Sequence, residues 1–178
     1  DNRLMRHLET CALEYGCPAG KNFFLQRYEA PLPTSTACNA DCIGCISLQT
    51  ENNLCACQER ISFIPMPEEI AQVSLEHITH VKKAVVSFGQ GCEGDPLTAF
   101  KTIEPAIRMI REKTGKGTIN LNTNAGIPKA VDDLCRAGLD AMRVSMNSVR
   151  EDYYSAYFRP RSYGFADVLK SIEMAKEK

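Results

Sequence analysis

Residues 118–124, TINLNTN, alternate between apolar and amide side chains, and this alternation decides the expected fold. Successive side chains of a strand point to opposite faces, so Ile119 and Leu121 share one face while asparagines occupy the other. Residues 141–147, AMRVSMN, alternate in the same way. A parallel sheet covered by helices on both faces is apolar on both. One polar face therefore predicts a curved sheet or barrel whose concave side holds a ligand, with an open, solvated sheet as the alternative.

Working outward from these strands, the chain alternates regularly between strands and helices. Expected strands are 84–89, 118–124 and 141–147, preceded by an extended run at 31–36. Each is followed by a stretch with apolar residues at helical spacing. Strands separated by single helices pair in parallel, so the sequence predicts an α/β protein with about four β/α units.

Particular residues predict where these helices begin and end. Pro67 opens one helix, and Pro128 opens another that stops at Gly138. Pro105 is expected in the first turn of its helix, because proline lacks the N–H that a helix interior requires. Ser148 and Glu151 have the spacing of a capping box for the next helix. An apolar stripe that begins at Phe165 predicts the last helix.

Composition excludes several classes of protein. The 178 residues include 21 basic and 22 acidic side chains without a basic stripe, which argues against nucleic acid and membrane surfaces as partners. No apolar run approaches the roughly 18 residues of a membrane span, and residues 1–30 lack a signal-peptide core. Nine cysteines, an odd number with three close together, suit metal ligation better than disulfides. We expect a cytoplasmic protein.

The clustered cysteines lie in ACNADCIGCIS, residues 37–47, with the spacing C-x3-C-x2-C. Two kinds of metal site fit this spacing. Structural zinc takes four ligands, and the fourth would come from Cys55, Cys57, His77 or His80. A [4Fe–4S] cluster held by three thiolates leaves one iron without a protein ligand, and that iron can chelate a small molecule.

The cysteine spacing resembles the CxxxCxxC signature of the radical S-adenosylmethionine (radical SAM) enzymes. The resemblance covers roughly residues 31–178 and places the motif in the loop after the first strand of a partial (β/α)6 barrel. It implies that residues 31–178 are a radical SAM core domain that lacks the last strands. Residues 1–30 would form a short, cysteine-containing N-terminal extension. The resemblance further implies that Cys38, Cys42 and Cys45 hold the cluster.

The same resemblance implies where S-adenosylmethionine (SAM) binds. Residues 89–97, GQGCEGDPL, resemble the family's glycine-rich segment near the SAM amino group, but Asp95 stands where the family usually has Glu, and Glu93 takes a usual glycine position. The ends of the third and fourth strands supply contacts to the SAM ribose and carboxylate. The implied cofactor-binding residues are Gly89, Gln90, Gly91, Glu93, Asp95, Asn124, Ser145 and Asn147. No residue is assigned a catalytic role.

The resemblance also implies the chemistry. An electron from the cluster splits SAM into methionine and a 5′-deoxyadenosyl radical, which abstracts hydrogen from a substrate. The substrate is not identified and would be a peptide or a small molecule; the reductant would be a protein such as flavodoxin or ferredoxin. Two alternatives from other classes are a non-catalytic Fe–S electron-transfer protein and a zinc-stabilised binding domain.

The remaining cysteines give weaker signals. Cys11, Cys17, Cys55 and Cys57 offer four thiolates, enough for an additional zinc ion or an auxiliary cluster, with free thiols as the alternative. Cys92 is expected to be a bystander in the glycine-rich segment.

Overall fold

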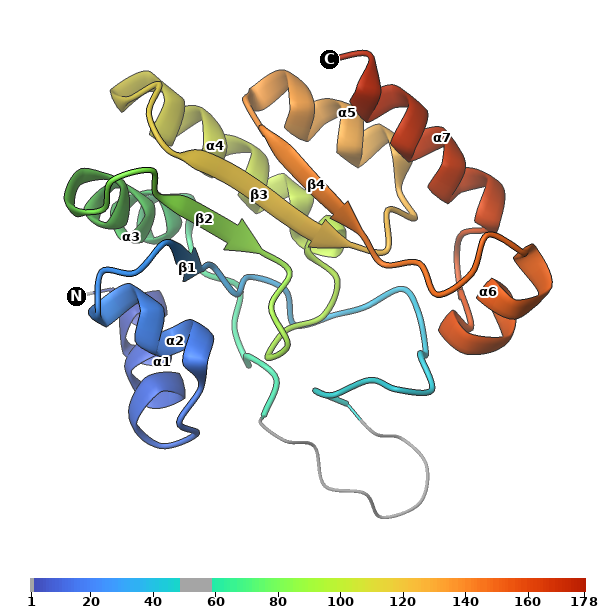
Figure 1. The fold of residues 1–178 in the computed structure, drawn as a ribbon, viewed down its shortest axis with the longest axis horizontal. Coiled ribbons are helices and arrows are strands. Elements are labelled where there is room, and N and C mark those ends of the chain that lie inside the picture. Colours follow the sequence, from blue (N-terminus) through green and yellow to red (C-terminus); the bar gives the residue numbers. More distant parts are fainter. Residues whose placement is uncertain (1, 49–58) are drawn as a thin grey trace.

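The computed structural model describes residues 2–48 and 59–178 and contains a four-stranded parallel sheet (Figure 1). Neighbouring strands in the sheet are also neighbours along the chain, and every pair is parallel. This confirms the predicted α/β class. The strands are β1 (Glu29–Pro31), β2 (Val85–Phe88), β3 (Thr118–Thr123) and β4 (Ala141–Val144).

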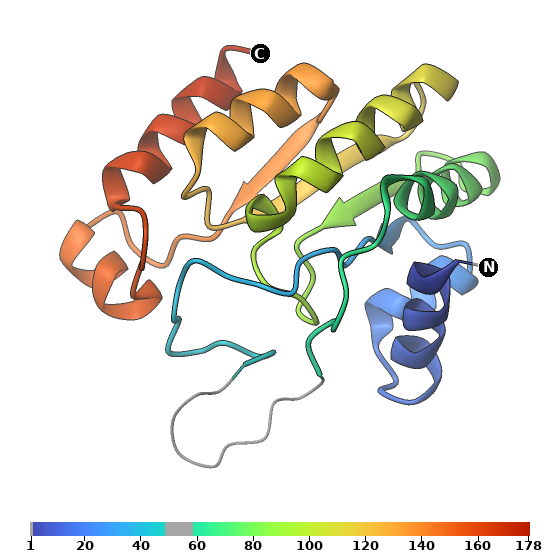
Figure 2. The ribbon, with the colours of Figure 1, turned by 180° about the vertical axis from the view of Figure 1, so that it is seen from behind.

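One face of the sheet is covered by a layer of helices, which lies in front of the strands in Figure 2. Along this layer α3 contacts α4, α4 contacts α5, and α5 contacts α7. The main core lies between this layer and the sheet, where Val86, Ile119 and Leu121 are fully buried. The helices of the layer are α3 (Pro67–His80), α4 (Phe100–Lys113), α5 (Pro128–Ala137) and α7 (Phe165–Lys176).

Two helices precede the first strand, α1 (Arg3–Leu13) and α2 (Pro18–Phe24). Helix α2 packs against β1 and α1 packs against α3. Leu4, Leu8 and Phe23 are buried in the same core as the sheet. The N-terminal segment is therefore part of the folded body and not a loose arm.

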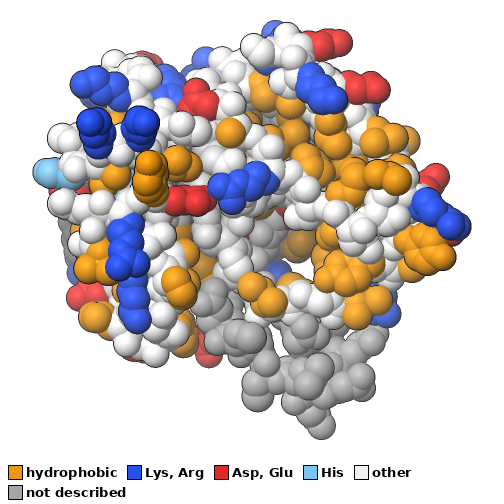
Figure 3. All heavy atoms as spheres, viewed as in Figure 1, with side chains coloured by type: hydrophobic (Ala, Val, Ile, Leu, Met, Phe, Trp, Pro, Cys, Tyr) orange, Lys and Arg blue, Asp and Glu red, His pale blue; other side chains and the backbone are white. Residues whose placement is uncertain are grey.

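A smaller apolar cluster lies at the β4 edge of the sheet. Helix α6 (Glu151–Phe158) packs against α7, and Tyr154 stacks on Phe158 with ring centroids 4.6 Å apart. Side chains of β4 and Cys42 pack against this cluster. Hydrophobic side chains gather on this side of the molecule in Figure 3. The cluster thus links the end of the sheet to the cysteine loop.

Three local predictions are corrected. The first strand is Glu29–Pro31, two residues earlier than the run at 31–36, because Val85 and Leu32 complete its pairing with β2. Pro105 lies inside α4, since a 3-10 turn, η1 (Pro96–Ala99), leads directly into a helix that begins at Phe100. Residue Arg150, and not Ser148, is the N-cap of α6; the Ser148 hydroxyl accepts a bond from the Arg150 N–H instead.

The polar strand face lies opposite the helix layer. Asn120 Nδ2 donates to Ser87 Oγ at 3.1 Å and to Asn122 Oδ1 at 3.1 Å, which joins β2 and β3 across this face. Arg143 on β4 pairs with Glu29 on β1 at 3.6 Å. The predicted division of the strands into an apolar and a polar face is confirmed. In the described part of the chain, no helix has both the length and the apolar character of a membrane span.

Candidate cofactor site

A cavity of about 180 Å³ lies where the carboxyl ends of β2, β3 and β4 meet the cysteine loop. It brings together segments that are far apart in sequence. Two of the predicted cofactor contacts, Gly91 and Asn147, do not line it. The predicted residues that do line it are Cys38, Cys42, Cys45, Gly89, Gln90, Glu93, Asp95, Asn124 and Ser145.

The glycine-rich segment holds one side of the cysteine loop by backbone pairing. Gly94 N–H donates to the Ser35 carbonyl at 2.7 Å, and Asp95 N–H donates to the Ala37 carbonyl at 3.0 Å. A Cβ atom on Gly94 would lie 1.8 Å from the Ala37 oxygen. Glycine is therefore required where this segment runs against the backbone that leads into Cys38.

Helix α6 and the residues after it hold the other side of the cysteine loop. Asp41 N–H donates to the Phe158 carbonyl at 3.1 Å, and Ile43 N–H donates to the Tyr157 carbonyl at 3.0 Å. The guanidinium of Arg161 pairs with the Asp41 carboxylate. Arg161 is thus an anchor of the cysteine loop.

Glu93 is a buried carboxylate that gathers backbone N–H groups from two loops. Its Oε2 accepts from Thr34 and Ser35, each at 2.8 Å, and its Oε1 accepts from Gly89 at 2.7 Å and Gln90 at 2.8 Å. Burial raises the pKa of Glu93 to about 7, and these N–H donors oppose the rise. Both oxygens already have partners, so Glu93 fixes the shape of the cavity wall.

Asp95 plays the same part between the glycine-rich segment and β3. Its Oδ2 accepts from the Asn124 N–H at 2.7 Å, and its Oδ1 accepts from the Leu97 N–H at 3.0 Å and the Thr123 hydroxyl at 2.8 Å. Burial raises the pKa of Asp95 despite these donors. Asp95, which was predicted to contact SAM, therefore also joins the segment after β2 to the end of β3.

The three clustered cysteines differ in their electrostatic surroundings. Burial raises the pKa of Cys38, and burial together with the nearby Cys38 and Cys45 charges raises that of Cys42 to about 11. Burial also acts on Cys45, but hydrogen bonds from Ser47 and Leu48 and the charge of Arg60 outweigh it, so the pKa of Cys45 is lowered. Three thiols that repel one another when ionised form a donor set suited to a cationic metal centre.

Arg60 is a site residue that the sequence analysis missed. Its guanidinium donates to Ser47 Oγ at 3.0 Å and approaches Cys45 Sγ at 3.8 Å, and Arg60 lines the cavity. No local pattern marks it, because it lies 15 residues beyond Cys45 in sequence and reaches the site only through the fold.

The other predicted ligands lie elsewhere. His77 contacts the Tyr28 carbonyl at 3.3 Å and His80 contacts Glu76, so neither histidine lines the cavity of the cysteines. Cys55 and Cys57 lie outside the described residues. Cys11, Cys17 and Cys92 line a separate, smaller cavity behind the glycine-rich segment. Cys135 packs against the main core.

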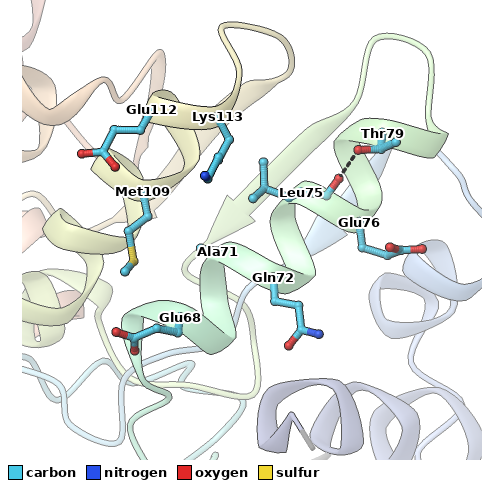
Figure 4. A pocket seen from close by; sticks show the side chains of 9 residues that line it. All are labelled: Glu68, Ala71, Gln72, Leu75, Glu76, Thr79, Met109, Glu112 and Lys113. Carbon is cyan, nitrogen blue, oxygen red and sulfur yellow. Dashed lines mark hydrogen bonds between the residues drawn. The ribbon is translucent and has the colours of Figure 1, made fainter.

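A larger cavity, about 550 Å³, lies on the outside of the helix layer between α3 and α4 (Figure 4). Among its lining residues are Leu75, Met109 and the charged residues Glu112 and Lys113. Figure 4 shows these side chains on two helix surfaces, without the converging thiols and strand ends of the smaller cavity. The chemistry therefore points to the smaller one.

Comparisons with known proteins bear on the family and the fold. The family model described as the radical SAM superfamily matches residues 32–178. Among solved structures, the chain is similar to HydG, a maturase of the [FeFe]-hydrogenase, with a TM-score of 0.54 and 21% sequence identity. That similarity covers 99% of this chain, including α1 and α2, and 38% of HydG. No curated protein sequence matches this one.

Proposed function

The chain belongs to the radical SAM superfamily, and from this premise we propose that Cys38, Cys42 and Cys45 hold a [4Fe–4S] cluster that SAM completes. When bound there, such a cluster supplies the electron that cleaves SAM to methionine and a 5′-deoxyadenosyl radical, which abstracts hydrogen from a substrate. The observation that carries the proposal is one cavity lined by all three cysteines and by the predicted SAM contacts of β2, β3 and β4.

One further feature of the site fits a cluster. Asn39 Nδ2, next to Cys38 in the loop, is a buried donor without a hydrogen-bond partner among the described residues. An N–H group of this kind suits the sulfur atoms of a cluster, whose potential is set in part by such bonds.

In this proposal, the residues that shape the cavity differ from those that contact SAM. Glu93 and Asp95 hold the loops, so the SAM contacts fall to Gly89, Gln90, Asn124 and Ser145. Gly89 has a φ of +80°, and a Cβ there would lie 1.8 Å from the Asn122 carbonyl oxygen. Only glycine allows this close approach at the cavity edge.

The remaining predictions complete the proposed enzyme. Residues 31–178 would be the radical SAM core, and residues 1–30 an extension that packs onto it. A flavodoxin or ferredoxin would supply the electron, and a thiolate-bound cluster suits the reducing cytoplasm. The polar strand face, with Asn120, Asn122 and Arg143, faces away from the helix layer and would meet a polar substrate, a peptide or a small molecule.

The experiment uses the protein reconstituted anaerobically with iron and sulfide. The EPR spectrum of the reduced protein is recorded with and without SAM, and 5′-deoxyadenosine is assayed in the same tubes. We expect a [4Fe–4S]⁺ signal that changes when SAM is added, together with 5′-deoxyadenosine. Cys42→Ala should lose both, while Cys135→Ser, which changes a thiol on α5, should retain both.

Two results would contradict the proposal. A cluster signal that SAM does not change, without 5′-deoxyadenosine, would identify an Fe–S electron carrier. Zinc without iron on the cysteine loop would identify a zinc-stabilised binding domain.

A further inference from the structure

Three metal-ligating side chains converge outside the proposed cluster site. The ligand atoms of His7, Cys11 and Cys92 all lie within 4.8 Å of one another. His7 and Cys11 are four residues apart on α1 and so share one face of the helix. Cys92 comes from the glycine-rich segment, 81 positions beyond Cys11 in the sequence. The sequence alone gave Cys92 and His7 no partner, and the fold brings them together.

The spacing fits a single tetrahedral ion. Zn–S bonds of about 2.3 Å and Zn–N bonds of about 2.1 Å in a tetrahedron separate a sulfur and a nitrogen ligand by about 3.6 Å. Cys11 Sγ and His7 Nε2 are 3.5 Å apart. Two thiols and one imidazole are also the ligand types that zinc prefers.

The surroundings favour one ion over a cluster. Cys11 and Cys92 are buried, with 2% and 4% of their surfaces exposed. The adjoining cavity, lined by Cys11, Cys17 and Cys92, has a volume of only about 30 Å³. A space of this size holds about one water molecule or one ion, but not several irons and sulfides. Cys17 also lines this cavity, and its N–H donates to the Cys11 carbonyl, but its sulfur is not one of the ligand atoms that lie within 4.8 Å of one another.

We propose that His7, Cys11 and Cys92 bind one Zn²⁺ ion that ties α1 to the glycine-rich segment. Cys92 is next to Glu93, whose carboxylate shapes the wall of the cofactor cavity. The backbone carbonyl of Cys92 also accepts a hydrogen bond from the Ile61 N–H at 2.8 Å. The ion would thus fix the segment from behind, and its binding does not depend on the proposed radical chemistry.

The test measures zinc and iron in the purified full chain by mass spectrometry of the metals. We expect about one zinc per chain, retained in Cys135→Ser and lost in the Cys11→Ser/Cys92→Ser double variant. Zinc should also persist when Cys38, Cys42 and Cys45 are all replaced by Ala, which separates this ion from the cluster loop. Replacing zinc with Co²⁺ should give the visible absorption bands of a tetrahedral thiolate site.

A second variant protects the test against misfolding. His7→Ala leaves both buried cysteines in place, and we expect a chelator to remove its zinc at least about tenfold faster than from the unchanged protein. Absence of zinc, zinc unaffected by the Cys11 and Cys92 substitutions, iron in its place, or a disulfide between Cys11 and Cys92 in the folded protein would overturn the proposal.

Discussion

The guanidinium of Arg161 pairs with the carboxylate of Asp41. This ion pair joins the segment that follows α6 to the middle of the cysteine loop. The two residues are 120 positions apart in the sequence. The backbone bond from Arg161 N–H to the Asn39 carbonyl, 2.9 Å long, lies beside this ion pair. The loop that would hold a cluster is therefore positioned by a late segment of the chain.

Arg161→Ala should loosen the cysteine loop with little effect on overall stability. The two side chains are 53% and 37% exposed, and ion pairs in contact with solvent contribute little to the free energy of unfolding. In cluster-free protein, we expect Cys42 to react faster with a thiol reagent in the Arg161→Ala variant than in the unchanged protein. Arg150→Ala, which breaks an exposed pair outside the loop, is the matched control. Equal reaction rates in the two variants would mean that the ion pair does not hold the loop.

Gly94→Ala should displace the cysteine loop, because the added Cβ would lie 1.8 Å from the Ala37 oxygen. Forcing an atom into such a contact costs about 1–3 kcal/mol. We expect urea unfolding to show a free energy of unfolding that is lower by this amount, and we expect the variant to take up less iron on reconstitution. Gly115→Ala is the control, since nothing lies within 4 Å of its added Cβ. A Gly94→Ala protein with unchanged stability would show that the loop can move aside freely.

Ser145 and Asn147 were both predicted to contact SAM, but only Ser145 lines the cavity. Loss of one hydrogen bond costs about 1 kcal/mol, or roughly a fivefold change in affinity. Ser145→Ala should weaken SAM binding by about that factor in calorimetry on the reconstituted protein, and Asn147→Ala should change it less than about twofold. If Asn147→Ala weakened SAM binding more than Ser145→Ala, SAM would lie nearer to Asn147 than the position of the cavity indicates.

The ion pair between Arg3 and Glu69 should make stability depend on pH in acid. Hydrogen bonding from Arg3 lowers the pKa of Glu69 from 4.5 to about 2. A carboxyl whose pKa is depressed by folding stabilises the protein above pH 4.5, and this contribution disappears as the pH falls toward 2. The difference in Tm between the unchanged protein and Arg3→Ala should therefore be constant near neutral pH and shrink below pH 4.5.

Lys101→Ala removes an exposed cation on α4 and serves as the control for this titration. Its Tm difference from the unchanged protein should not follow the titration of Glu69. If the difference for Arg3→Ala also stays constant down to pH 2, the ion pair does not stabilise the fold.

The sequence by itself determined the features that depend on local spacing. The alternation in 118–124 set the two faces of β3, the alternation of strands and helices set a parallel sheet, and C-x3-C-x2-C placed three thiols in one loop. These follow from periodicity and chain reach, which act between near neighbours. Local rules failed at Pro105 and Ser148, where the neighbouring turn, and not the residue type, decided the helix boundary.

Only the tertiary structure decided which side chains share a site. It showed that Glu93 and Asp95 bind backbone N–H groups across loops and placed Arg60 beside Cys45. It also brought His7 and Cys11 against Cys92. Such contacts join residues that are far apart in the sequence. They form only when the packing of the core brings α1 and the loops against the sheet. No local pattern contains that information, because the energy that selects these pairs belongs to the whole fold.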